Sequence, residues 1–187
     1  KPNQLHNNCA GKHLAMISSC LMQKYKLGNY LNINHPHQIK IREIFERFSE
    51  VKIKENSFGI DGCSAPQYSF KMKDVLKSLT NLNKSYKGKF QNSYEVKLLI
   101  NAILDNPLYI GGTDSLDSRI INISNKKIFC KGGAEGVFLF IDLIKNISGV
   151  IKITDGNERA IPFILLELFK KFKIMSKKKL DTLKEIY

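Results

Sequence analysis

The sequence has no tryptophan, and only four of its 30 basic residues are arginines. Proteins that read nucleic-acid sequence usually rely on arginine clusters or on aromatic stacking platforms, and neither pattern is present. The net charge is +13, but the lysines that carry it are dispersed along the whole chain. We therefore expect no specific nucleic-acid partner, and only a weak, salt-dependent attraction to polyanions.

Cysteines are also few, and Cys9, Cys20, Cys63 and Cys130 form no Cys-x-x-Cys pair. That spacing excludes a zinc knuckle. The first residues lack the charged start and the apolar block of a secretory signal peptide. Every apolar run is interrupted by lysine or aspartate before it could span a bilayer. We therefore expect reduced thiols, a cytoplasmic location and no membrane partner.

The chain does have the composition of a globular domain, with 187 residues of which 43% are hydrophobic. We expect one domain, residues 1–187, with an α+β fold in which helices come first and an antiparallel sheet covered by a C-terminal helix follows. Apolar spacing and turn residues predict the following elements. Helices are predicted at 12–27, from His35-Pro36 onward, and at 70–82, 92–105, 115–121, 155–169 and 176–187; strands at 51–60, 127–131, 135–143 and 149–154.

Three polar clusters stand out against this background. Residues 5–13 combine amide, thiol, amine and imidazole groups, and an amphipathic helix follows them at once. The second cluster is Gly59-Ile60-Asp61-Gly62-Cys63, and the third is Cys130-Lys131-Gly132-Gly133-Ala134-Glu135-Gly136. No ordinary structural demand explains the first mixture, so we predict that the three clusters converge on one pocket.

Cys9, Lys12 and Cys63 are candidate metal ligands. Two thiolates and one amine could hold a zinc ion and leave a fourth position open. Lysine is a rare ligand because its nitrogen must be neutral, which a nearby cation and partial burial would favour. The alternative is that both cysteines are small buried residues and that Lys12 is a surface charge.

His13, Asp61 and Lys131 are candidate binding or catalytic residues. His13 stands at the positive end of a predicted helix, where a carboxylate ligand is favoured, although it could be an ordinary helix residue. Asp61 could hold the α-amino group of a small substrate or simply form an Asx-turn. Lys131 precedes two glycines at a strand end and resembles the Lys-x-Gly element of serine β-lactamases, although a surface lysine in a hairpin would look the same.

Serine nucleophiles are harder to assign. Ser49, Ser124 and Ser176 each have a lysine three positions later, as in the Ser-x-x-Lys signature. Lysine is so frequent here that chance matches are expected. None of the three lies beside a polar cluster, so we assign no nucleophile.

Residues 6–13, His-Asn-Asn-Cys-Ala-Gly-Lys-His, resemble the H-N-N-C-[SA]-G-K-H signature of the bacterial type II L-asparaginases of the Rhizobium etli kind, the thermolabile class unrelated to the threonine-nucleophile asparaginases. Further motifs of that family occur in the same order along nearly the whole chain. They are His35-Pro36-His37-Gln38, Gly59-Ile60-Asp61-Gly62-Cys63 with Pro66, Asn106-Pro107, Gly111-Gly112 with Asp117, and the segments 131–137 and 152–160.

The resemblance implies a β-lactamase-like fold, hydrolysis of L-asparagine to L-aspartate and ammonia, and a homodimer. It implies a zinc-type site on Cys9, Lys12 and Cys63, in which the metal orders the pocket. It places His13, Asp61 and Lys12 at substrate-binding positions, and it makes Lys131 a catalytic residue that joins the serine chemistry.

In that family the nucleophilic serine and its partner lysine lie in a segment that precedes the H-N-N-C motif, whereas this sequence begins at Lys1, just before the motif. The expectation is therefore that the chain is the C-terminal portion of an asparaginase and hydrolyses asparagine negligibly alone. Two other readings stay open: a zinc-dependent amidohydrolase in which metal-bound water attacks the amide, and a non-catalytic module that binds a small amino acid.

Overall fold

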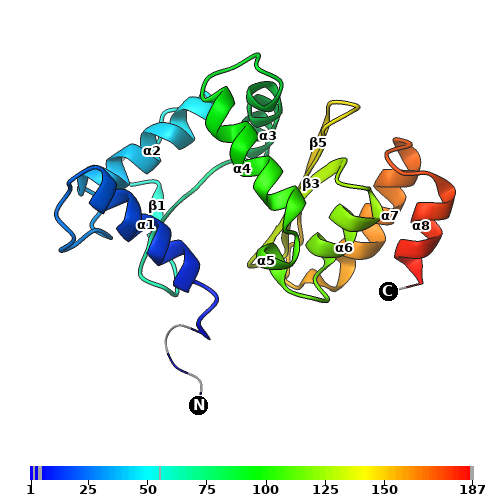
Figure 1. Cartoon of the computed structure of the whole chain (residues 1–187), viewed down its shortest axis with the longest axis horizontal. Coiled ribbons are helices and arrows are strands. Elements are labelled where there is room, and N and C mark those ends of the chain that lie inside the picture. The colour runs from blue at the N-terminus through cyan, green and yellow to red at the C-terminus, as the bar shows by residue number, and fades with distance from the viewer. Residues whose placement is uncertain (2, 4–5, 55, 186–187) are drawn as a thin grey trace. The chain divides into compact units, whose positions relative to one another are not determined.

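A computed structural model of the chain describes residues 1, 3, 6–54 and 56–185 (Figure 1). Leu5 of the first polar cluster, Glu55 of a predicted strand and the last two residues of the predicted C-terminal helix lie outside the described residues. Contacts divide the chain into two compact units, Lys1–Asp74 and Val75–Tyr187. Each unit is described by itself.

The first unit contains two helices and a small antiparallel hairpin. Helix α2 begins where predicted, with Pro36 in its first turn. The His35 ring accepts a hydrogen bond from the backbone N–H of His37 at 3.2 Å and so caps the helix. The elements are α1 (Ala10–Met22), α2 (Pro36–Ser49), β1 (Phe58–Ile60) and β2 (Pro66–Tyr68).

Helix α1 is shorter than the predicted span 12–27. It ends at Met22, and Lys24 then takes a left-handed conformation with φ of 57°, which stops the helix. Its buried residues are Met16 and Cys20. The apolar side chains of Leu14, Leu21 and Met22 are exposed.

Residues 51–60 form a strand only at Phe58–Ile60. The beginning of the predicted strand is held by a helix side chain instead, since the Glu46 carboxylate accepts hydrogen bonds from the Ile53 N–H at 2.9 Å and from Lys52 Nζ at 2.7 Å. The hydrogen bond from Lys52 lowers the pKa of Glu46, and although partial burial opposes this, the Ile53 N–H adds to the lowering. A tertiary side-chain contact thus replaces strand pairing here.

Glu46→Gln should therefore remove a pH-dependent part of the stability of the first unit. Because the pKa of Glu46 is lower in the folded chain, its contacts stabilise the fold above the ordinary value of about 4.3, and this contribution is lost as the pH falls. Lys52 is highly exposed, so we expect a loss of only about 1 kcal/mol at pH 7. Denaturant unfolding at pH 7 and pH 4 should show the difference shrinking at pH 4. A difference that grows at pH 4 would contradict this account.

Most of helix α3 (Met72–Tyr86) belongs to the second unit, and the helix extends beyond its predicted end at residue 82. Two polar residues beyond the predicted end, Asn83 and Ser85, are buried within the helix. Asn83 donates to Asn146 Oδ1 at 3.3 Å, and Ser85 Oγ donates to the carbonyl of Gln91 at 2.6 Å. The partner of Asn83 is distant in the sequence, so local polar composition does not predict that the helix continues past residue 82.

Helix α4 (Ser93–Asp105) ends where predicted, and no side-chain cap closes its start. Asn92 has φ of 55° and its side chain makes no cap hydrogen bond. Ser93 Oγ instead donates to the carbonyl of Phe90 at 2.5 Å. Two short helices follow, α5 (Leu108–Gly111) and α6 (Leu116–Ile123).

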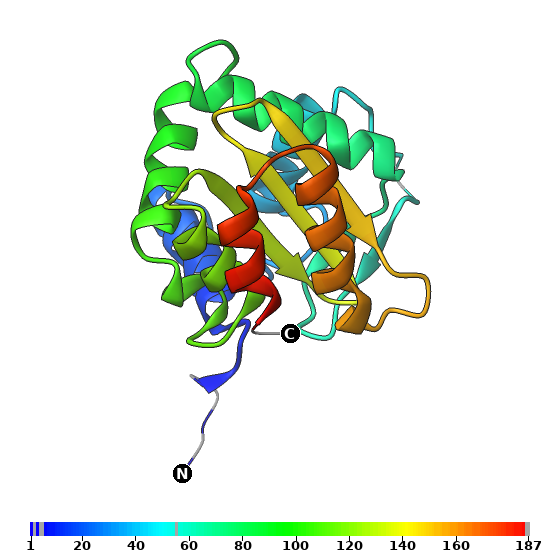
Figure 2. The same ribbon diagram turned by 90° about the vertical axis from the view of Figure 1, so that its right-hand side faces the viewer.

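A three-stranded antiparallel sheet of order β3-β4-β5 confirms the predicted meander. Figure 2 shows α7 and α8 lying across one face of this sheet, which confirms the predicted helical cover and the α+β class. Phe140 and Phe169 meet edge to face there, with ring centroids 5.1 Å apart. The elements are β3 (Ile128–Gly133), β4 (Val137–Asp142), β5 (Ile147–Lys152), α7 (Ile161–Lys171) and α8 (Lys177–Lys184).

Two further observations complete the fold. The helix predicted from residue 155 begins later, because a short 3-10 turn, Glu158–Ala160, precedes α7 and is capped by the Asn157 side chain. None of the helices within the described residues is both long enough and apolar enough to cross a membrane.

Gly149→Ala should destabilise the second unit. Gly149 pairs with Phe140 across β4 and β5, and a methyl group at Gly149 would overlap the buried Phe140 ring. Forcing that ring to move should cost about 1–3 kcal/mol in the free energy of unfolding, measured by urea denaturation. Ser148→Ala on the same strand is the matched control, with an expected change below about 0.5 kcal/mol. Equal losses in the two variants would contradict the packing argument.

Candidate functional site

The first unit brings Cys9 and Cys63 together from the start of α1 and the turn after β1. The hydrogen bond between the two sulfur atoms raises the pKa of the Cys63 thiol, and partial burial raises it further. The positive charge of Lys12 acts on the same thiol in the opposite direction. The three side chains predicted from the sequence as metal ligands, Cys9, Lys12 and Cys63, are therefore neighbours.

Lys12 and Asp61 form an ion pair between Nζ and Oδ2 at 2.5 Å. The Lys12 hydrogen bond holds the pKa of Asp61 well below its usual range, although burial opposes this. Burial alone would lower the pKa of Lys12, but the hydrogen bond and charge of Asp61, together with Cys9 and Cys63, outweigh it and raise that pKa. Without a metal, Lys12 is thus a charged ammonium group.

Asp61 also shapes the turn that carries Cys63. Its Oδ1 accepts hydrogen bonds from the backbone N–H groups of Cys63 at 2.8 Å and Ala65 at 2.9 Å. This is the Asx-turn alternative, and it coexists with the contact to Lys12. Asp61 Oδ2 accepts a further hydrogen bond from Gln67 Nε2 at 3.1 Å.

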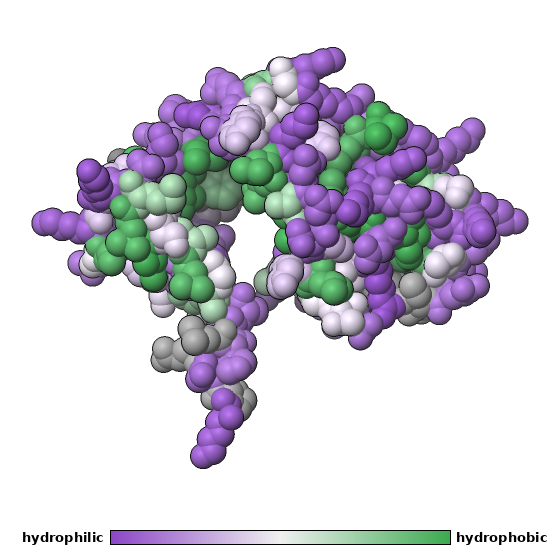
Figure 3. Space-filling view, in the orientation of Figure 1, coloured by the Kyte–Doolittle hydropathy of each residue, from purple (hydrophilic) through white to green (hydrophobic). Residues whose placement is uncertain are grey.

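A pocket of about 540 Å³ opens beside these groups. Leu14 and Ile17 form an apolar wall of the pocket, and Leu14, Leu21 and Met22 leave apolar surface exposed along α1. Figure 3 shows this exposed apolar surface over α1. The described residues that line the pocket are Asn7, Cys9, Ala10, His13, Leu14, Ile17, Gly62 and Cys63.

His13 lines the pocket and is also held from behind. Its Nδ1 shares a hydrogen bond with the Tyr30 hydroxyl at 2.7 Å, and the two rings meet edge to face. The Tyr30 carbonyl accepts from Gln38 Nε2 at 2.9 Å, which fixes the tyrosine in turn. Sequence reasoning missed Tyr30, because nothing in the segment between α1 and α2 indicates that its hydroxyl reaches His13.

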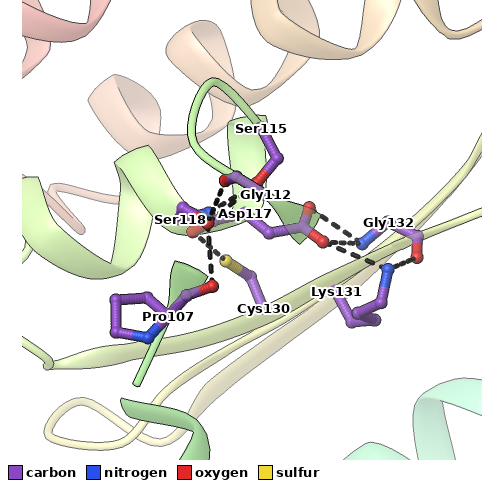
Figure 4. A network of polar contacts seen from close by, with 8 residues as sticks. All are labelled: Pro107, Gly112, Ser115, Asp117, Ser118, Cys130, Lys131 and Gly132. Carbon is purple, nitrogen blue, oxygen red and sulfur yellow. Dashed lines mark hydrogen bonds and ion pairs between the residues drawn. The ribbon is translucent and has the colours of Figure 1, made fainter. Parts of the chain in front are cut away.

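The third cluster lies in the second unit, where Lys131 projects from β3 toward Asp117 of α6 (Figure 4). Lys131 Nζ lies 3.2 Å from Asp117 Oδ2 and also donates to the carbonyl of Gly132. The Gly132 N–H lies 3.0 Å from each carboxylate oxygen of Asp117. Asp117 is 5% exposed, so a buried carboxylate faces the ammonium group of a half-exposed lysine.

Comparison of the chain with known protein families agrees with these motifs. The family model for L-asparaginase II matches residues 1–187. The chain belongs to the L-asparaginase II family. No curated protein matches the sequence significantly. Membership of the L-asparaginase II family indicates an amidohydrolase with asparaginase chemistry in general.

Two serines of this asparaginase family member lie near Asp117, and both are engaged. Ser118 Oγ is 2.8 Å from the carbonyl oxygen of Pro107 and 2.9 Å from that of Gly112. Ser115 Oγ accepts the Ser118 N–H at 3.1 Å, so it caps α6. Burial raises the pKa of Cys130, which donates weakly to the Asp117 carbonyl at 3.5 Å and stays a neutral thiol. These groups fix the start of α6 and thereby the position of Asp117.

Two of the three serines of the Ser-x-x-Lys matches, Ser49 and Ser124, make structural hydrogen bonds. Ser124 Oγ donates to the carbonyl of Ile121 at 2.9 Å, and Ser49 Oγ accepts the Val51 N–H at 3.3 Å. Ser176 is exposed at the start of α8. Within the described ranges, none of the three serines is paired with the lysine three positions later.

The donor set fits a metal only in part. Among the residues that the structure describes, no group of three or more His, Cys, Asp or Glu side chains is placed to hold a metal ion. Of the three predicted ligands, Cys9 and Cys63 supply thiols. The third, Lys12, is held as an ammonium group by Asp61. A divalent cation held by the two thiolates would favour loss of a proton from the Lys12 ammonium group. The three residues therefore fit zinc if Lys12 binds it as a neutral amine.

Proposed function

We propose that this member of the L-asparaginase II family hydrolyses L-asparagine to L-aspartate and ammonia. The observation that carries the proposal is the pocket beside Cys9, Lys12, Asp61 and Cys63, whose chemistry suits a small zwitterion. Asp61 is an acceptor for an α-ammonium group, and the metal ion that Lys12 would bind as a neutral amine would supply the positive charge for an α-carboxylate. His13 lies at the start of α1, where the helix dipole also favours negative charge.

Lys131 is our candidate for the catalytic residue in this chain. Its ammonium group would stabilise the negative charge that develops on the amide oxygen in the transition state, a role that an electrostatic donor fulfils without moving. The ion pair with buried Asp117 supports a fixed cation rather than a mobile base.

We propose that Cys9, Cys63 and Lys12 bind zinc. The ion would order the pocket and the charged end of the substrate, and we assign it no part in forming the nucleophile. Asp61, released from Lys12 when zinc takes the amine, would then be available to the substrate ammonium. The hydrogen bonds from Cys63 and Ala65 would keep its other oxygen in place.

Zinc content gives a direct test of this assignment. Cys9→Ser and Cys63→Ser should each lower the bound zinc, weakening affinity by about tenfold or more, because thiolate is the better ligand for zinc. Cys20→Ala is the matched control, since Cys20 lies on the same helix but is buried outside the pocket. Dialysed protein would be measured by inductively coupled plasma mass spectrometry. Unchanged zinc in both serine variants would refute the site.

We further propose that the nucleophilic serine is supplied from outside residues 1–187. Support comes from the engagement of Ser115 and Ser118 in helix capping, and from Lys131 pairing with a carboxylate instead of a serine hydroxyl. The chain of residues 1–187 should then hydrolyse asparagine negligibly by itself. The β-lactamase-like fold, the homodimer and the cytoplasmic location implied by resemblance stay predictions; sedimentation analysis of the purified protein would test the dimer.

Ammonia release from L-asparagine by the complete gene product tests the function. The serine mechanism predicts that a chelator reduces turnover only by disordering the pocket, and that a serine-directed acylating reagent abolishes it. A metal-water mechanism predicts the reverse, with activity lost on chelation and insensitive to the serine reagent. Stabilisation by asparagine without ammonia release would leave only a binding module.

A further inference from the structure

The second unit carries a groove of about 730 Å³ between α7 and α8, and nothing in the asparaginase proposal uses it. Helix α7 lines it with one stripe of residues spaced i, i+3, i+4 and i+7, which is the spacing of one helix face. That stripe is Phe163, Leu166, Glu167 and Lys170.

Helix α8 contributes a second stripe with the same spacing. Its members are Lys177, Leu180, Asp181 and Lys184. Each stripe has a leucine followed by an acidic residue in the middle and a lysine at its C-terminal end. The two helices therefore present matching faces to one groove.

The floor of the groove is apolar and open to solvent. Phe163 is 59% exposed, whereas Met175, from the loop between the helices, is buried at the bottom. Leu166 and Leu180 are half-buried on opposite walls. Covering this surface with another apolar face would release its water and is therefore favourable.

The rim of the groove is cationic. Four lysines surround the apolar floor against two carboxylates, Glu167 and Asp181. Among the described residues none of these six side chains has an ion-pair partner, so the charges face solvent. The four lysines are Lys170, Lys173, Lys177 and Lys184.

We propose that the groove docks a short, acidic amphipathic helix of a partner protein. A third helix is the natural occupant of a groove between two helices, since its apolar ridge can pack between two apolar stripes. Helices α7 and α8 have 11 and 8 residues. The occupant therefore spans roughly 12–16 Å, or two to three turns. Acidic flanks on that helix complement the lysine rim, and its leucine-like residues cover Phe163.

The concave shape favours a helix over an anionic membrane. A lipid surface meets a convex or flat apolar face, whereas the floor of this groove lies between two walls. The small area limits affinity, and we expect a dissociation constant of about 10–100 µM at low salt. Salt should weaken the binding, because the rim charges are exposed.

The probe is a fluorescein-labelled synthetic helix with leucines at i, i+3, i+4 and i+7 and glutamates elsewhere, titrated with the protein and read by fluorescence polarisation. A scrambled peptide of the same composition, which has no apolar face, is the first control. The double variant Lys170→Glu/Lys177→Glu should weaken binding of the probe about tenfold. The double variant Lys171→Glu/Lys178→Glu makes the same change in net charge outside the groove and should alter affinity less than about twofold.

The matched double variant separates docking from general attraction to a basic protein. Equal weakening by the two double variants, or equal binding of the scrambled peptide, would overturn the proposal. Absence of probe binding at 1 mM protein would also overturn it, because that concentration is about ten times the weakest dissociation constant expected. Anionic phospholipid vesicles that bind through Lys170 and Lys177 while the probe does not would also overturn it, and would assign the groove to a lipid surface.

Discussion

Lys131→Met should lower kcat for asparagine hydrolysis by the complete gene product roughly 10²–10³-fold, the usual cost of removing one preorganised electrostatic donor. Methionine keeps the length and volume of lysine but removes the charge. KM should change little, because the cation acts on charge that develops only in the transition state. Steady-state kinetics with coupled detection of ammonia measure both parameters.

Lys127→Met is the control for this result. Lys127 is an exposed lysine just before β3 and makes no contact with Asp117. It should retain wild-type kcat. A Lys131→Met enzyme with more than about half of wild-type kcat would show that the charge on Lys131 is dispensable, and would remove it from the mechanism.

Asp117→Asn should lower kcat by about 10–100-fold, with a smaller effect on KM. The amide oxygen can still accept the Gly132 N–H, but the amide carries no charge to hold Lys131, whose ammonium group would then move within its half-exposed surroundings. Because Asp117 is buried, we also expect a loss of about 1–3 kcal/mol in the free energy of unfolding.

Two comparisons separate positioning from damage to the fold. Asp114→Asn removes another aspartate near α6, one that is 85% exposed and paired with Arg119, and it should leave kcat unchanged. Asp117→Glu keeps the charge and should recover part of the lost kcat. If Asp117→Asn and Asp114→Asn behave alike, Asp117 does not position Lys131.

Local patterns predicted much of the fold. Proline in the first turn of α2 and the turn residues between short β-branched runs give signals that depend on neighbours in the sequence. The helix start at Pro36 and the meander over residues 128–152 were accordingly predicted well. The end of α3 was not, because Asn83 is buried by a partner in a distant hairpin. Glu46 similarly replaced a predicted strand by a tertiary contact.

In the candidate site too, some residues could be predicted from the sequence and others could not. Residue chemistry left Cys9, Lys12 and Cys63 open as a metal set, and the resemblance of the motifs to a known family favoured it; the three side chains are neighbours in the structure. The charged partner of Lys131 was missed by reasoning from residue chemistry, since an aspartate in the first turn of a short helix is typical of ordinary helix starts. Tyr30 was missed because only folding brings its hydroxyl to His13.

The central claim is that this member of the asparaginase family is an asparagine hydrolase whose serine chemistry lies outside residues 1–187. Its most direct test is the release of ammonia and aspartate from L-asparagine, measured side by side for the complete gene product and for the chain of residues 1–187. We predict equimolar release of both products by the former and negligible release by the latter. Release by residues 1–187 alone at the rate of the complete protein, or none by the complete, folded and zinc-loaded protein, would contradict it.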